Sequence, residues 1–105
     1  MISYDDITGT LTCKPAGELD SHMAERIRNT IDSEILKSGA KVLLIDMTDV
    51  PFMDSSGIGM MIGRYKLMKR LNGRMQVTGM QESVHKIFRM SGLGQIINLR
   101  KDEHP

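Results

Sequence analysis

Hydrophobic residues recur along the chain with two spacings, one typical of strands and one typical of helices. The clearest strand signals are the alternation of apolar and polar residues over 10–17 and the nearly continuous apolar run over 41–47. The apolar run is bounded by turn residues, which is typical of a central strand covered by helices. We expect strands over residues 2–7, 10–17, 41–47 and 74–78, with a last short strand or turn at Ile96 and Ile97.

Three segments between these strands carry apolar residues at helical spacing. We expect helices from Asp20 or Ser21 to about Lys37, from about Ser55 to Leu71, and from Glu82 to Met90. Asp20 or Ser21 can cap the first helix and Asp54 the second, because a side-chain oxygen there accepts a hydrogen bond from a free backbone N–H. The apolar face expected for the second helix is Ile58, Met61, Ile62, Tyr65 and Met68.

The order of these elements predicts the fold class. After an opening hairpin, helices and strands alternate, which implies βαβ units and a parallel sheet. The hairpin adds one antiparallel strand. We therefore expect an α/β fold, a single domain over residues 1–105, with a mixed, mostly parallel sheet of four to five strands and three to four helices packed on it.

Composition narrows the function classes. The net charge is +1, which supplies no long-range field for gathering nucleic acid or anionic lipid. The single cysteine, Cys13, cannot form an internal disulfide. A membrane-spanning helix needs about 18 consecutive apolar residues, and no apolar run in the sequence approaches that length. The first ten residues lack the pattern of a signal peptide. We expect a cytoplasmic protein with no direct nucleic-acid or membrane partner.

Metal and cofactor chemistry finds no support in the sequence. His22, His85 and His104 do not share the spacing of metal ligands, and no phosphate-binding loop motif is present. We expect no metal, no cofactor and surface positions for the histidines. Cys13 lies on the alternating strand and is expected in the core.

The segment from Val50 to Gly59 carries the candidate chemistry. It lies between a buried strand and a helix, at the edge of an open α/β sheet where ligands and partners commonly bind. With Asp54 as the cap, Ser55 and Ser56 fall in the first helical turn, near free N–H groups and the positive end of the helix. A phosphate added there would be tolerated by the helix and would change the outer surface.

Four blocks of sequence match a known family in the same order along nearly the whole chain. They are Gly17 to Asp20, Phe52 to Gly59, Gly63 to Lys66 and Met90 to Leu93. On these blocks the chain resembles the anti-sigma factor antagonists, the STAS family, and within it the sporulation type. Ile58, where leucine is frequent, and Ser21-His22 after Asp20 are minor departures from the family pattern.

The resemblance implies a regulatory binding protein rather than an enzyme. The serine after the motif aspartate, here Ser55, is phosphorylated in that family by the anti-sigma factor, which is itself an ATP-binding serine kinase. The unphosphorylated antagonist binds that kinase and releases the sigma factor, and a serine phosphatase restores the active form. The family suggests a monomer. The partner-binding residues implied here are Asp20, Asp54, Ser55, Ser56, Gly57 and Gly59.

Several of these residues also have ordinary structural explanations. Asp20 can serve in simple capping or in kinase recognition, and Ser56 is expected to be structural or to make a minor contact. The glycines of the second helix, Gly57, Gly59 and Gly63, have two open explanations: close helix–sheet packing, or close approach of a partner backbone. The expected solvated basic face comprises Arg64, Lys66, Lys69, Arg70 and Arg74.

Three rival functions are considered. A phospho-acceptor receiver domain would use Asp46 with the acidic pair Asp5-Asp6, but only four residues precede that pair. A serine hydrolase would use Ser55 with His85 as the base, but the nucleophile-elbow motif is absent. The third is a STAS module of a stress-response partner-switching pathway, which only the identity of its partner separates from the sporulation type.

Overall fold

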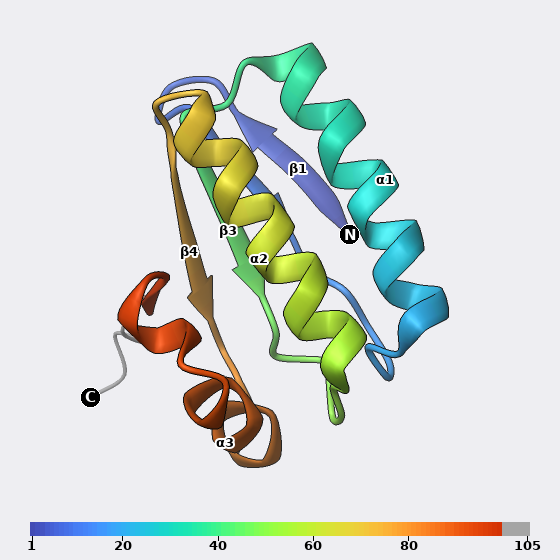
Figure 1. The fold of residues 1–105 in the computed structure, drawn as a ribbon. Helices are drawn as coiled ribbons and strands as arrows, with labels where there is room; N and C mark the ends of the chain where they lie inside the picture. The colour runs from blue at the N-terminus through green and yellow to red at the C-terminus, as the bar shows by residue number, and fades with distance from the viewer. Residues whose placement is uncertain (100–105) are drawn as a thin grey trace, which may run out of the picture.

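The structure, a computed structural model, describes residues 1–99, and after an opening pair of strands, helices and strands alternate as far as α3 (Figure 1). The tail Lys101 to Pro105 and His104 lie outside the described residues. The strands are β1 (Ile2–Asp5), β2 (Thr10–Cys13), β3 (Val42–Asp46), β4 (Arg74–Thr78) and β5 (Asn98–Leu99). The helices are α1 (Ser21–Ser38), α2 (Ser55–Arg70), α3 (Glu82–Met90) and a short 3₁₀ helix (Leu93–Gln95).

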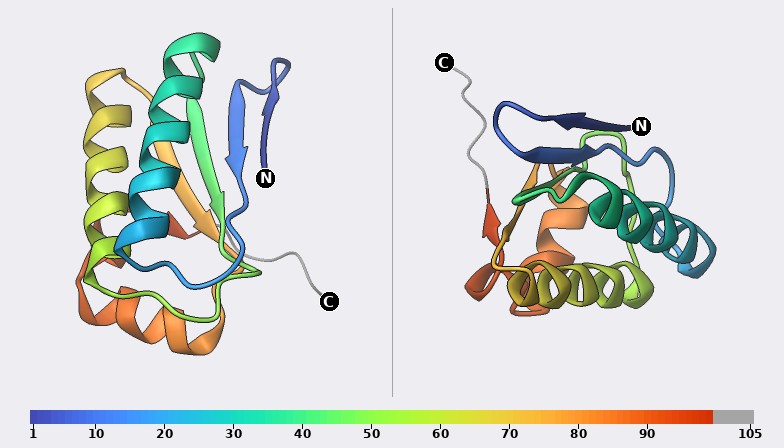
Figure 2. Two further views of the ribbon diagram at one scale, coloured as in Figure 1. Left: turned by 90° about the vertical axis from the view of Figure 1, so that its right-hand side faces the viewer. Right: turned by 90° about the horizontal axis from the view of Figure 1, so that it is seen from above.

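The five strands described form one sheet in sequence order, β1-β2-β3-β4-β5. The β1–β2 pair is antiparallel, and every other neighbouring pair is parallel, with Leu43 of β3 registered between Leu11 of β2 and Met75 of β4. The expected mixed, mostly parallel sheet with an opening hairpin is confirmed. Helices α1 and α2 lie side by side on one face, while α3 lies beyond the carboxyl end of β4 (Figure 2).

The first two strands are shorter than the sequence pattern predicts. β1 ends at Asp5, whose carboxylate accepts a hydrogen bond from the backbone N–H of Ile7 (3.0 Å) and starts the turn. β2 ends at Cys13, two residues before Pro15, which has no N–H to continue a ladder. A single bridge from Ala16 to Asp49 is all that remains of the expected strand beyond that point.

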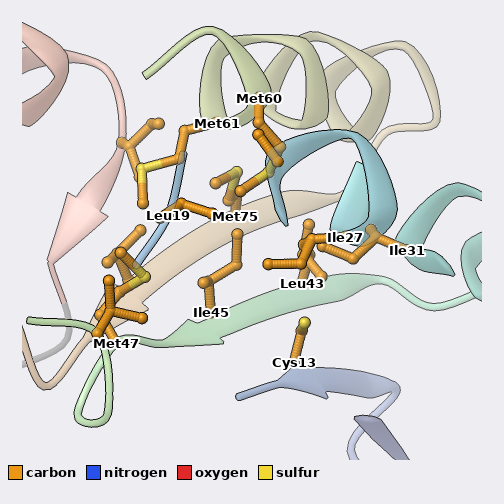
Figure 3. Packing of buried hydrophobic residues seen from close by; sticks show 14 of the residues in the cluster. Cys13, Leu19, Ile27, Ile31, Leu43, Ile45, Met47, Met60, Met61 and Met75 are labelled. Atoms are coloured by element: carbon orange, nitrogen blue, oxygen red, sulfur yellow. The ribbon is translucent and has the colours of Figure 1, made fainter. Parts of the chain in front are cut away.

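The core lies between the sheet and the α1–α2 layer and is rich in methionine (Figure 3). Met47, Met53, Met61 and Met75 are buried there. Cys13, 1% exposed, is confirmed as a core residue, and burial raises the pKa of its thiol to about 11. The flexible thioether chains of methionine fill the irregular space that helices leave over a twisted sheet.

The buried face of α2 is only partly the expected one, because Met61 and Met68 are buried as predicted and the other three residues are not. Ile58, Ile62 and Tyr65 are only half-buried. The reason is that α2 has the sheet below it and α1 along one flank, so the residues that turn toward α1 are enclosed while the opposite flank stays at the rim. The residues actually buried are Gly57, Met60, Met61, Arg64 and Met68.

Candidate functional site

Two helices begin side by side at the carboxyl end of the sheet. The loops that lead into α1 and α2 are joined by backbone hydrogen bonds: the N–H of Leu19 donates to the carbonyl of Phe52 (2.8 Å), and the N–H of Asp54 donates to the carbonyl of Leu19 (3.4 Å). Leu19 and Met53 form a parallel bridge. Because each of these residues immediately precedes a helix cap, the amino termini of α1 and α2 are held next to each other.

Both helices are capped by aspartate. Asp20 accepts a hydrogen bond from the N–H of Met23 (3.0 Å), and Asp54 accepts one from the N–H of Ser56 (2.8 Å). The two open candidates for the first cap are thus resolved in favour of Asp20, and Asp54 is confirmed as the second cap. Caps of this kind typically contribute about 1 kcal/mol each to helix stability. They also place two carboxylates at the same end of the molecule.

The structure distinguishes the two serines of the motif. Ser55, the first residue of α2, is exposed, whereas Ser56 is half-buried and its backbone N–H is used by the cap. An added anion on Ser55 would lie outside the domain, at a helix end whose free N–H groups favour negative charge. Phe52, 46% exposed, adds an apolar side chain to the same loop.

The glycines of α2 have different roles. A Cβ at Gly57 would clash with the side chain of Met53 and would lie 3.0 Å from Cγ of Leu19. Gly57 is buried, so its role is close packing inside the domain rather than contact at the surface. A Cβ at Gly59 or Gly63 would meet nothing within 4 Å. The packing explanation therefore holds for Gly57 alone.

Alanine substitutions at these glycines are expected to change stability in opposite directions. Gly57→Ala should lower the free energy of unfolding by about 1–3 kcal/mol, since the added methyl group overpacks the site. Gly59→Ala and Gly63→Ala should each raise it by roughly 0.5–1 kcal/mol, the helix-propensity gain of alanine over glycine. Urea unfolding of the three variants measures the difference, and equal effects at all three positions would contradict the assignment.

Arg64 is not part of a solvated basic face, and that expectation was wrong. Its side chain is 10% exposed, and its Nε lies 2.8 Å from Oδ1 of Asp32, which joins α2 to α1. Burial lowers the pKa of Arg64, Asp32 opposes that shift, and Arg28 and Arg70 add to it. The sequence contains one indication that Arg64 is buried: at helical spacing it lies on the same face of α2 as Gly57, Met60 and Met61.

An open groove of about 410 Å³ separates the first turns of α1 and α2. It begins at Ser21 and Ser56, next to the two caps, and extends to Arg64. Its walls are the facing rows of the two helices: Ser21, Ala24, Glu25 and Arg28 from α1, and Ser56, Gly59, Met60, Gly63 and Arg64 from α2. The sequence alone did not predict this groove, because the patterns of single helices do not show how two helices lie against each other.

The receiver arrangement does not fit the register of the sheet. Asp5 pairs with Thr10, which pairs with Val42, so Asp5 lies in the row of residues where β3 begins. Asp46 is the last residue of β3 and lies about 13 Å along that strand from Val42, at 3.3 Å per residue. An acceptor aspartate and its acidic pair must share one metal ion, and these lie at opposite ends of the sheet. Asp46 instead accepts a hydrogen bond from the N–H of Thr48 (3.0 Å).

Within residues 1–99, no group of three or more His, Cys, Asp and Glu side chains is arranged to hold a metal ion. Over the same described range, none of the helices combines the length and the apolar character that crossing a bilayer requires. His22 is exposed and His85 is half-buried on α3.

Comparison with known proteins identifies the family. The model of the STAS domain family matches residues 1–105, and the chain belongs to that family. The resemblance found in the sequence motifs is therefore confirmed, and so is the predicted fold class.

Similar proteins point to one group within the family. The chain is 35% identical over 102 residues to an anti-sigma F factor antagonist of Paenibacillus polymyxa, covering 97% of this chain and 87% of the relative. It is 31% identical over 88 residues to an anti-sigma-B factor antagonist of Listeria monocytogenes, covering 84% of this chain and 76% of the relative.

A solved structural relative is known in two forms. The anti-sigma factor antagonist SpoIIAA in its unphosphorylated form is 30% identical with a TM-score of 0.80, covering 98% of this chain and 90% of that one. The Bacillus cell fate determinant SpoIIAA in its phosphorylated form is 28% identical with a TM-score of 0.71, covering 98% of this chain and 94% of that one.

Proposed function

We propose that this chain is an anti-sigma factor antagonist controlled by phosphorylation of Ser55. In the unphosphorylated form it binds an anti-sigma factor that is also a serine kinase, and a sigma factor is released as a result. Phosphorylation of Ser55 ends the interaction, and a serine phosphatase restores it. The observation that carries the proposal is the exposed position of Ser55 in the first turn of α2, beside the capped start of α1.

The chemistry of that position supports a switch that acts on binding and not on folding. A phosphoserine carries about −1.5 to −2 charges at neutral pH. Because Ser55 projects outside the core, the phosphate would leave the packing of Met53 and Gly57 undisturbed. Together with Asp20 and Asp54 it would build a concentrated negative surface, which repels an acidic partner surface and is difficult to desolvate.

The proposed contact surface follows from the same geometry. It consists of Asp20, Asp54, Ser55, Ser56 and Gly59, with Gly57 acting from inside by allowing α2 to approach Met53. ATP would arrive with the kinase, so the chain needs no cofactor or metal of its own. We further propose a monomer that works in the cytoplasm without direct contact to nucleic acid or membrane.

A second candidate is a stress-response role in place of sporulation. The 31% identity to an anti-sigma-B factor antagonist favours it, and the site would be the same. The two roles differ only in which anti-sigma factor binds. Measuring the affinity of the purified chain for each anti-sigma factor kinase encoded in its own genome separates them.

Incubation with that kinase and ATP should add a single phosphate to Ser55. Mass spectrometry of proteolytic fragments locates the modified residue, and Ser55→Ala should abolish the modification. Ser33→Ala is the control, because Ser33 is an exposed serine of α1 that lies outside the proposed contact surface. Undiminished phosphorylation of Ser55→Ala, or its loss in Ser33→Ala, would contradict the proposal.

A further inference from the structure

Two glycines of α2 leave space that the domain itself does not use. Gly59 and Gly63 line the groove between α1 and α2, and an added Cβ at either would touch nothing within 4 Å. Alanine stabilises a helix more than glycine does, so two glycines facing open space are expected only if the space itself has a use. Across the groove, Ala24 is also small. The groove is therefore shaped to let another backbone approach α2 closely.

At the far end of the groove lies the guanidinium of Arg64, whose hydrogen-bond donors are not all satisfied. Arg64 lines the groove with a side chain that is nine-tenths buried, and its Nη1 has no hydrogen-bond partner. Its contact with Asp32 is an ion pair without a hydrogen bond, since the Nε of Arg64 and Oδ1 of Asp32 both lack a partner of that kind. A buried guanidinium has five donors to satisfy, so an additional acceptor is expected.

The charges around Arg64 indicate the kind of acceptor. Arg28, which also lines the groove, and Arg70 both act electrostatically on Arg64, with Asp32 as the one acidic group among these partners. Glu25 lies on the groove wall one helical turn before Arg28 and forms no ion pair among the described residues. With Glu25 included, three arginines face two carboxylates, so this end of the groove still has a net positive charge, and a further carboxylate pairs well with guanidinium groups.

We propose that the groove between α1 and α2 binds a segment of the partner anti-sigma factor that presents an Asp or Glu side chain. The segment backbone packs against Gly59 and Gly63, and its carboxylate is bound by Arg28 and Arg64. The inference rests on the proposed function, because the groove opens at Ser21 and Ser56, directly beside Ser55. A partner seated over Ser55 therefore extends into the groove without a break in its contact surface.

Two substitutions test the groove in a binding assay with the purified kinase. Arg28→Glu reverses an exposed charge, and Gly63→Leu fills the open space; neither disturbs the core. Each should weaken binding by about tenfold or more, as expected for lost charge complementarity and lost close contact. Arg26→Glu and Lys66→Leu are the controls, exposed on the same helices but outside the groove, and should bind like the unmodified chain. Unchanged affinity of both groove variants would overturn the inference.

The groove can also be tested without an anti-sigma factor. NMR titration with the peptide acetyl-Gly-Glu-Gly-amide should shift the amide signals of Gly59 and Gly63 and the Nε–H signal of Arg64, and the corresponding Gln peptide should not. Equal shifts with both peptides, or none, would overturn the inference. So would sedimentation showing that the chain dimerises and that Arg28→Glu restores the monomer, since a second copy would then fill the groove.

These outcomes separate the two proposals. If the unmodified chain binds no anti-sigma factor and Ser55 is not phosphorylated, the proposed function fails, and the peptide titration still decides whether the groove selects a carboxylate. If the chain binds and is phosphorylated while both groove variants behave like the unmodified protein, the proposed function stands and the groove inference fails.

Discussion

Ser55→Asp should fold like the unmodified chain and lose most of its affinity for the anti-sigma factor. The new carboxylate lies in the first turn of α2, where the helix dipole typically stabilises an anion by about 0.3–1 kcal/mol. That gain offsets repulsion from Asp20 and Asp54 in the folded domain. At the proposed contact surface the added charge hinders docking, and we expect binding to weaken by about tenfold to a hundredfold.

Isothermal titration calorimetry measures the affinity, and thermal unfolding followed by circular dichroism measures the fold. Ser55→Asn is the matched variant, because asparagine has nearly the shape of aspartate without its charge, and it should retain most of the affinity. Ser33→Asp places the same charge at an exposed position of α1 outside the proposed contact surface and the groove, and it should retain full affinity if the effect belongs to Ser55. A melted Ser55→Asp domain would refute the helix-terminus argument, and full affinity would refute the assignment of Ser55.

Asp32→Ala should destabilise the domain far more than Arg64→Met. Removing Asp32 leaves the guanidinium of Arg64 nine-tenths buried with no carboxylate near Nε. The loss of one partner from a buried ion pair costs about 3–5 kcal/mol. Asp32 is about a third exposed, so water replaces part of its contribution, and we expect about 2–3 kcal/mol here.

Arg64→Met removes the buried charge and leaves Asp32, which is partly exposed, free to be hydrated. Methionine resembles the arginine stem in length and suits the neighbouring Met60 and Met61, so we expect a change of less than about 1 kcal/mol. Urea unfolding of both single variants and the double variant measures the coupling. The reverse order, with Arg64→Met the more damaging, would show that the ion pair itself holds α1 against α2.

Much of the fold could be predicted from the sequence because its signals are local. The apolar run of β3 and the caps Asp20 and Asp54 each depend on a few neighbouring residues. The exposure of Ser55 is a similar case, because it follows from a position directly after the cap. These signals were strong enough to predict the order of elements, the mixed sheet and the two helix starts.

The errors occurred where the neighbour of a residue lies far away in the chain. Arg64 looks like one member of a basic cluster, and only its position against Asp32, on another helix, shows that it is buried. In the same way Ile58 and Ile62 look like fully buried residues of α2, but α1 lies on the opposite flank and they pack only against the margin of the core. Periodicity reports that a helix has an apolar side, but the direction of that side depends on every element that packs against it.

The sequence by itself determined the class of fold, the two capped helix starts and the serine at the start of α2, since capping and periodicity act over three or four residues. Only the tertiary structure decided that the two caps are neighbours, because that depends on the backbone bonds joining Leu19 to Phe52 and Asp54. It also decided that Gly57 packs inward while Gly59 and Gly63 face a groove. Glycine has no side chain whose polarity would indicate burial or exposure, so its role can be assigned only from the positions of the atoms around it.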